Sequence, residues 1–486
     1  MAGLFLRISR NKIAIFGFSI IALASLGLVR LIFNIVLGVT YPLESAEIIG
    51  RANIALSLGL FIAMIGATGY TNVISKFVSD ALSRNDYASA RSIYKRAFQY
   101  ALLLLLILSL IIGLLSPEIA RLLQVDTSYL FLSIPIMILG GTYSVQRAVF
   151  YAIGIPNSYC MRELISDSIF FISFFIIILF LSPRNGYILI PFSVMYLVFL
   201  TISFGTINRH LPESKEKVTT SCPMTSFMTL STMGTVLAMA IIYLSNLFIG
   251  AMKGPADAGL YAAAFSAASL VLLIPNGIGQ VILPEIAFLW GKKEIILMIK
   301  GIQTWTTTLL ILISLIAGTM IILSQDILAL LFGSAFSNAS VAMILILFGI
   351  LELAIARPSI SALVGTEYLT VTSSTSIVAF IIAIIMWLIL IPQFSILGAA
   401  IGYLAAASIN SFVPMIYATK KWKIDWKLLS IPAASFILLI IIILILVSES
   451  TISERLIATG IFLLFYVIIN ISSIRRSIRD IQIAGK

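Results

Sequence analysis

Long apolar stretches separated by short polar segments run along nearly the whole chain. A helix needs about 20 residues to cross the roughly 30 Å of hydrocarbon in a bilayer. Each stretch therefore predicts a transmembrane helix, in which every backbone hydrogen bond is made within the segment. The sequence predicts fourteen spans, at residues 12–38, 46–70, 94–115, 128–151, 164–181, 187–207, 225–250, 257–283, 303–323, 339–363, 370–391, 396–418, 428–447 and 455–472.

The polar segment 208–224 divides these spans into six and eight, and an internal repeat supports this division. At an offset of 208 residues, "LSPEIARLL" (115–123) aligns with "LSQDILALL" (323–331). We therefore expect an all-α polytopic membrane protein with two six-helix lobes, 1–207 and 225–418, related as parallel repeats. Residues 208–224 are the predicted cytoplasmic linker, 428–472 carry two additional helices, and 473–486 form a basic cytoplasmic tail.

The composition fits this assignment, since 60% of the residues are hydrophobic and 10% are charged, against about a quarter charged in soluble proteins. Most of the 31 Lys and Arg lie in alternate connections, which the positive-inside rule assigns to the cytoplasm. This distribution predicts a protein of the cytoplasmic membrane with both termini inside, and it explains the net charge of +11 without nucleic acid. The basic segments 81–96 and 290–300 are predicted to be amphipathic surface helices.

Two arginines in the first two spans suggest a binding site. Arg30 is the only ionisable residue between Ile13 and Val39. Asn34 lies on the same helical face, and Arg51 lies near the start of the second span. Both arginines are expected roughly 10 Å below the outer interface. Guanidinium groups bind phosphate in a bidentate manner, so an anion site is one interpretation. In the alternative, Arg51 pairs with Glu47 one turn earlier and Arg30 extends outward to the interface.

Two more arginines and two acids lie at membrane depth. Arg147 and Arg357 align at an offset of 210, near the cytoplasmic ends of their spans. They are either further parts of a cationic cavity or ordinary positive-inside anchors. Asp167 and Glu352 either pair with an arginine or carry a coupling Na⁺ or H⁺.

No enzymatic centre is visible in the sequence. It contains no P-loop, HExxH or Gly-x-Ser-x-Gly pattern and no paired cysteines. We therefore expect a transporter that does not hydrolyse nucleotides, with no cofactor and no metal site.

Four stretches resemble a known family: "GLYAAAFSAASLVLLIPNGIGQVILPEIAFLWGKKE" (259–294), "LLFGSAFSNASVAMILILFG" (330–349), "ALVGTEYLTVTSST" (362–375) and "LILIPQFSILGAAIG" (388–402). With the arrangement of six, six and two helices, the chain resembles the polysaccharide transporter branch of the multidrug/oligosaccharidyl-lipid/polysaccharide exporter superfamily, which includes the Wzx-like O-antigen flippases. The resemblance implies two lobes around a cavity and alternating access. It also implies a lipid-linked glycan as substrate, contacts with membrane lipids, and glycan polymerase or assembly proteins as partners.

Three other functions stay open at this point. Related lipid II flippases have arginines in the first two helices, to which Arg30 and Arg51 are similar, but span 257–283 lacks their helix 8 arginine. Multidrug-type antiporters have twelve helices and usually an acid in the first, where this chain has arginine. A scaffold of a glycan-assembly complex that does not itself transport is the third alternative.

Overall fold

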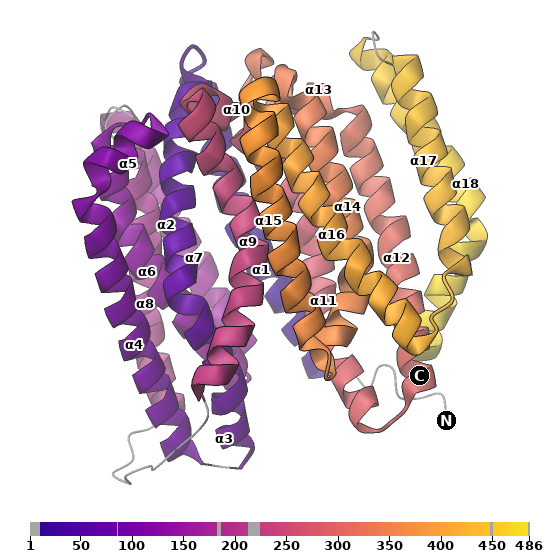
Figure 1. Cartoon of the computed structure of the whole chain (residues 1–486), viewed down its shortest axis with the longest axis horizontal. Coiled ribbons are helices and arrows are strands. Elements are labelled where there is room, and N and C mark those ends of the chain that lie inside the picture. Colours follow the sequence, from indigo (N-terminus) through magenta and orange to yellow (C-terminus); the bar gives the residue numbers. More distant parts are fainter. Residues whose placement is uncertain (1–9, 85, 182–185, 212–223, 448–450, 485–486) are drawn as a thin grey trace. The chain divides into compact units, whose positions relative to one another are not determined.

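The computed structural model describes residues 10–84, 86–181, 186–211, 224–447 and 451–484, and all of its regular structure is helical (Figure 1). The predicted all-α class is therefore confirmed. Most of the predicted linker lies outside the described residues. The helices are α1 (Arg10–Thr40), α2 (Ser45–Val73), α3 (Ser79–Ser83), α4 (Tyr87–Leu114), α5 (Ser116–Leu123), α6 (Thr127–Ala152), α7 (Pro156–Phe180), α8 (Ile190–His210), α9 (Met224–Lys253), α10 (Pro255–Ser269), α11 (Leu273–Gly291), α12 (Ile295–Ile322), α13 (Ser324–Phe332), α14 (Ser340–Gly365), α15 (Leu369–Phe394), α16 (Ile396–Trp422), α17 (Lys427–Val447) and α18 (Ile452–Ala484). The described residues also contain one π-helical segment, η1 (Ile74–Val78), and the 3₁₀ segments η3 (Tyr187–Leu189), η4 (Leu270–Leu272) and η5 (Ser334–Ala339).

Within the described residues, thirteen helical segments are long and apolar enough to cross a membrane, and they match the second to fourteenth predicted spans. The first predicted span lies within α1, which has 31 residues. The chain is thus a multi-pass membrane protein. The cytoplasmic placement of both termini stays a prediction. Helix α18 continues to Ala484, so the described part of the predicted tail is helical.

The two predicted surface helices are wrong. Helix α2 continues through η1 and α3 to Ser83, and α4 begins at Tyr87, so 81–96 holds the ends of two long helices around a tight turn. In the same way, α11 ends at Gly291 and α12 begins at Ile295. Their amphipathic pattern arises because the ends of membrane helices extend into the polar interface, where charged side chains are solvated.

The turn before α4 is fixed by an N-cap, because the side chain of Asp86 accepts a hydrogen bond from the backbone N–H of Ser89 at 2.9 Å. Hydrogen bonds from the side chain and backbone of Ser89 lower the pKa of the Asp86 carboxyl. The stabilisation by the ionised cap is therefore present above the unfolded-state pKa and lost as the pH falls through the folded pKa.

Removal of the Asp86 side chain tests the contribution of this cap to stability. Asp86→Ala is expected to lower the Tm at neutral pH, and this difference is expected to vanish once the pH is below the folded pKa of Asp86. Glu294, at the same position before α12, makes no side-chain cap, so Glu294→Ala is the matched control. Thermal unfolding in detergent across this pH range measures both, and an equal loss for both variants would contradict the cap.

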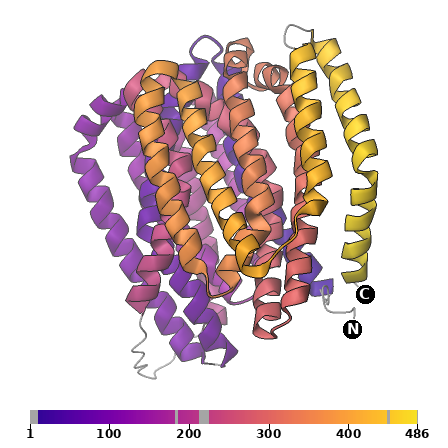
Figure 2. The same cartoon turned by 45° about the vertical axis from the view of Figure 1, so that its right-hand side comes forward.

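The described residues form two compact units. The N-terminal unit comprises residues 21–33 and 43–262, in which α2 packs against α6 and α9. The C-terminal unit comprises the described residues of 1–20, 34–42 and 263–486, in which α14 packs against α12 and α16. In the latter, α17 and α18 form a pair beside α12 (Figure 2). This division differs from the predicted lobes, since α9 clusters with the N-terminal unit and the boundary falls within α10.

The internal repeat is visible in the helix boundaries. Helices α4 and α12 both have 28 residues and begin 208 positions apart, and α5 and α13 begin at the same offset. Tight packing recurs as well. A Cβ atom at Gly140 would lie 3.4 Å from the Tyr196 ring, and one at Gly349 would lie 2.9 Å from the Tyr403 ring. The same glycine–tyrosine contact thus packs the fourth and sixth spans together in each half.

Candidate functional site

Arg51 lies in the second turn of α2 between two acids. Its Nη2 atom lies 2.5 Å from Glu47 Oε1, one turn earlier, and its Nη1 atom pairs with Asp126, which precedes α6. The sequence suggested the Glu47 pair as an alternative, and it is present. The contribution of Asp126 was not foreseen, because no local pattern indicates where the connection between α5 and α6 lies.

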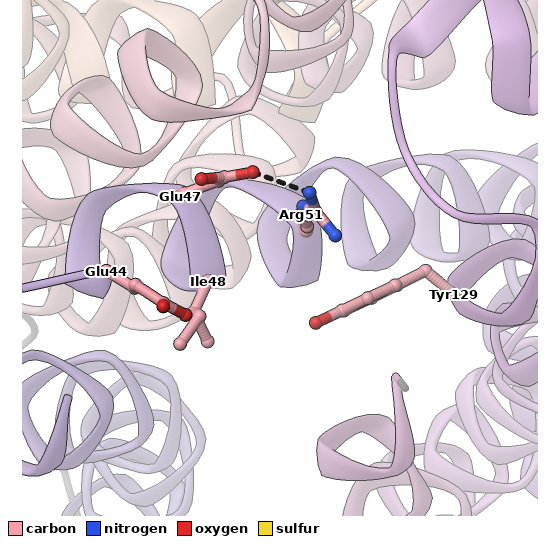
Figure 3. A pocket seen from close by; sticks show the side chains of 5 residues that line it. All are labelled: Glu44, Glu47, Ile48, Arg51 and Tyr129. Atoms are coloured by element: carbon pink, nitrogen blue, oxygen red, sulfur yellow. Dashed lines mark hydrogen bonds and ion pairs between the residues drawn. The ribbon is translucent and has the colours of Figure 1, made fainter. Parts of the chain in front are cut away.

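A cavity of about 240 Å³ opens beside this ion pair, lined by Glu44, Glu47, Ile48, Arg51 and Tyr129. Figure 3 shows the Tyr129 hydroxyl and the Arg51 guanidinium pointing towards the same space. The lining side chains include two carboxylates and one guanidinium, so the cavity carries no net positive charge. A phosphate would reach Arg51 only after its ion pairs open, and the anion-binding role of Arg51 stays a prediction.

Arg30 has different surroundings. It is half-buried on α1, and its Cζ atom lies 5.9 Å from the centroid of the Tyr243 ring on α9. No ion pair involves Arg30 among the described residues. A cation–π contact provides about 0.5–2 kcal/mol and leaves the N–H donors of the guanidinium available. Asn34, one turn further along α1, is buried.

Two buried acids face one side of α7. Glu163 and Asp167, four residues apart, are 1% and 3% exposed. The Tyr143 hydroxyl donates to Glu163 Oε1 at 2.6 Å, and the Ser25 hydroxyl donates to Asp167 Oδ2. The second oxygens, Glu163 Oε2 and Asp167 Oδ1, are buried and accept no hydrogen bond from the part of the chain that the structure describes. Two acids with unmatched acceptors in a buried site favour a bound proton or cation.

Arg147 completes the same polar cluster. Its Cζ atom lies 5.6 Å from the Tyr159 ring centroid, and the Tyr159 hydroxyl is 3.3 Å from that of Tyr143. Among the described residues, no acid forms an ion pair with Arg147, and the guanidinium instead lies beside the hydrogen-bonded group of Tyr159, Tyr143 and Glu163. The structure thus brings predicted Arg147 and Asp167 into one cluster through Glu163. Glu163 was not predicted from the sequence, although its spacing of four residues from Asp167 places both on one face of a helix.

In the C-terminal unit, Glu352 and Arg357 lie on α14 without pairing. Glu352 Oε2 accepts a hydrogen bond from the Ser408 hydroxyl of α16 at 2.7 Å. The Arg357 guanidinium lies against the backbone of α11 at Gly279, and its buried Nε atom has no hydrogen-bond partner among the residues described. No described acid forms an ion pair with Arg357. Arg357 therefore joins Arg30 and Arg147 as a half-buried arginine candidate that forms no ion pair with a described acid.

The close approach at Gly279 gives a test of Arg357. A Cβ atom there would lie 3.0 Å from Nη2 and 3.1 Å from Cζ of Arg357, so Gly279→Ala displaces the guanidinium without changing any charge. We expect a several-fold loss of transport, as large as that of Arg357→Gln. Gly291→Ala, at the end of the same helix where a Cβ meets nothing within 4 Å, is the control.

The double variant Gly279→Ala/Arg357→Ala distinguishes displacement of the guanidinium from simple steric destabilisation of the fold. In this double variant the shorter alanine side chain at position 357 no longer clashes with the added Cβ atom. Its Tm should therefore return towards the wild-type value, whereas its transport should stay low. Full transport by stable Gly279→Ala protein would show that the position of Arg357 is unimportant.

Residues 57–340 match the protein family described as polysaccharide biosynthesis protein. This chain belongs to that family. The predicted resemblance is therefore confirmed, and the matched region covers the α7 acids, the Tyr243 ring and most of the N-terminal unit. No curated protein sequence matches the chain.

Solved structures of transporters share the fold of this polysaccharide biosynthesis protein. The Vibrio cholerae MATE transporter VcmN has a TM-score of 0.62 at 14% identity, covering 86% of this chain and 97% of that chain. The lipid II flippase MurJ, in an inward closed conformation, has a TM-score of 0.61 at 15% identity, covering 92% and 99%. An inward-facing multidrug resistance MATE family transporter of the MOP superfamily has a TM-score of 0.59 at 13% identity, covering 83% and 98%. At these identities the likeness establishes the fold.

Proposed function

We propose that this protein is a flippase that moves an oligosaccharide linked to an isoprenoid (pyro)phosphate across the cytoplasmic membrane by alternating access. The family match supports a role in polysaccharide biosynthesis, and the fold is shared with a membrane flippase. The observation that carries the proposal is Arg30, a cation in a membrane span whose described surroundings provide an aromatic ring but no ion pair. A charge so placed is costly unless a ligand compensates it.

In this mechanism Arg30 binds the phosphate by charge-assisted hydrogen bonds, while the isoprenoid tail stays in the lipid. An inside-negative potential favours outward movement of an anion by about 2.3 kcal/mol per charge per 100 mV. About two charges on a diphosphate thus provide roughly 4–5 kcal/mol without nucleotide hydrolysis. Arg357 and, after its ion pairs open, Arg51 are proposed to bind the same class of anion. Arg147 is proposed to act through Glu163.

The buried acids of α7 are the proposed site of ion coupling. Glu163 and Asp167 each carry one oxygen without a hydrogen-bond donor, which a proton or Na⁺ would satisfy. Glu352 is the corresponding candidate in the C-terminal unit. We also propose that both termini lie in the cytoplasm and that glycan assembly enzymes are partners.

A second function, ion-coupled export of a small molecule, is favoured by one observation, the same buried acid pair in a transporter fold. Proteoliposomes distinguish the two functions. A flippase changes the leaflet in which an isoprenyl-diphosphate glycan is accessible, whereas an antiporter accumulates small cationic dyes and leaves the glycan in place.

A further inference from the structure

Aromatic side chains gather at one end of the C-terminal unit. Four of the five tryptophans of the chain belong to this cluster. Trp290 at the end of α11 lies 6.4 Å from Trp422 at the end of α16, measured between ring centroids. Tyr368, before α15, lies 6.4 Å from Trp290 and 6.1 Å from Trp422. Tryptophan and tyrosine concentrate where membrane helices meet the headgroup region, so this cluster places the end of the unit at that depth.

Exposed lysines surround the aromatic cluster. Their ammonium groups come from the connections between α11 and α12 and between α16 and α17, which Figure 1 shows at the lower end of the C-terminal unit. Lys421 Nζ lies 5.0 Å from the centroid of the Tyr368 ring. The exposed lysines of this rim are Lys292, Lys293, Lys300, Lys420, Lys421, Lys423 and Lys427, and the acids among them are Glu294, Glu367 and Asp425. The rim is therefore strongly positive.

Two of these lysines adopt a backbone conformation that lysine disfavours. Lys293, after α11, and Lys423, after α16, have φ angles of 60° and 53°. Glycine or asparagine is the usual residue at such helix ends, because most other side chains crowd the backbone there. Both positions carry an ammonium group at the end of a helix that contributes a tryptophan to the cluster.

We propose that this rim and the aromatic cluster together bind the phosphate headgroups of anionic phospholipids. The aromatic rings set the depth of the helix ends at the interface, and the lysines then lie level with the phosphates. Each lysine near an anionic surface strengthens the attraction by about fivefold. Phospholipid is the ligand because the rim encircles the ends of membrane-spanning helices, where lipid headgroups are the neighbouring anions.

The first half of the chain offers an internal contrast. At the repeat offset of 208, Trp290 aligns with Leu82 and Tyr368 aligns with Cys160, so these two rings of the cluster are not repeated in the sequence of the first half. Exposed basic residues do occur in that half, including Lys76, Lys95 and Arg96. They allow the same charge to be removed away from the tryptophans, although Lys76 Nζ still lies 5.4 Å from the centroid of the Phe77 ring.

The test uses the full-length protein in vesicles of phosphatidylcholine alone or of an equal mixture with phosphatidylglycerol. The variant is Lys293→Gln/Lys421→Gln/Lys423→Gln, and the control is Lys76→Gln/Lys95→Gln/Arg96→Gln. Native mass spectrometry measures retained phosphatidylglycerol, and thermal unfolding measures the Tm. We expect the wild type and the control to gain stability from phosphatidylglycerol. The variant should bind it on the order of 100-fold more weakly and lose that gain.

Equal loss in the control would show a general effect of surface charge and overturn the proposal. Undiminished phosphatidylglycerol binding by the variant would overturn it as well. Stabilisation by inorganic phosphate in vesicles of phosphatidylcholine alone would show a site for free anion in place of lipid. Tyr368→Leu, which keeps every lysine, should weaken binding, whereas Tyr368→Phe should retain it because the ring under Lys421 remains.

Discussion

Arg30→Gln is expected to reduce glycan export by about 10- to 100-fold at normal protein levels. This range corresponds to the roughly 1.5–3 kcal/mol of one hydrogen bond to a charged group. Arg30→Lys should retain part of the activity, because lysine keeps the charge but loses the bidentate geometry. Surface glycan and membrane protein levels are measured in the same cells. Arg121→Gln, an exposed arginine of α5, is the control for loss of a positive charge.

The same assay separates Arg30 from Arg51. Since Glu47 and Asp126 already neutralise Arg51, Arg51→Gln should reduce export less than Arg30→Gln. Part of its effect should come from the two acids left without their partner, so Asp126→Asn should relieve it. A larger loss for Arg51→Gln than for Arg30→Gln would mean that the ion pairs open in the transporting state and that Arg51 is the principal phosphate ligand.

Neutralising the buried acids of α7 is expected to uncouple transport from the ion gradient. In Asp167→Asn and Glu163→Gln the bound ion or proton is no longer required, so transport should stop responding to an imposed Na⁺ or pH gradient. The transport rate of each variant should equal that of the wild type measured without a gradient. With a gradient that supplies about 1.4 kcal/mol, this rate is about tenfold below that of the wild type. The readout is glycan movement in proteoliposomes with and without each gradient.

Tyr143→Phe serves as the control for this pair, because it removes the donor to Glu163 and leaves both carboxyls. It should weaken the response to the gradient without abolishing it. If Asp167→Asn and Glu163→Gln both respond to the gradient as the wild type does, coupling at α7 is wrong, and Glu352 becomes the candidate to test.

The sequence predicted those features that depend on local patterns. Apolar length located the membrane helices, and the repeat offset matched the starts of α4 and α12. The pair between Arg51 and Glu47 followed from a spacing of one helical turn. Glu163 was missed because its burial depends on which face of α7 packs inward, and Asp126 because its contact joins residues 75 apart. The segment 81–96 was misassigned because a tight turn between two helix ends has the composition of a surface helix.

The central claim is that Arg30 binds the phosphate of a lipid-linked glycan during its passage across the membrane. The most direct measurement follows an isoprenyl-diphosphate oligosaccharide in proteoliposomes that contain this protein alone, under an applied potential. The account predicts that the glycan becomes accessible in the opposite leaflet with the wild type and much more slowly with Arg30→Gln. Equal rates for the two proteins, or no movement of glycan by the wild type, would contradict it.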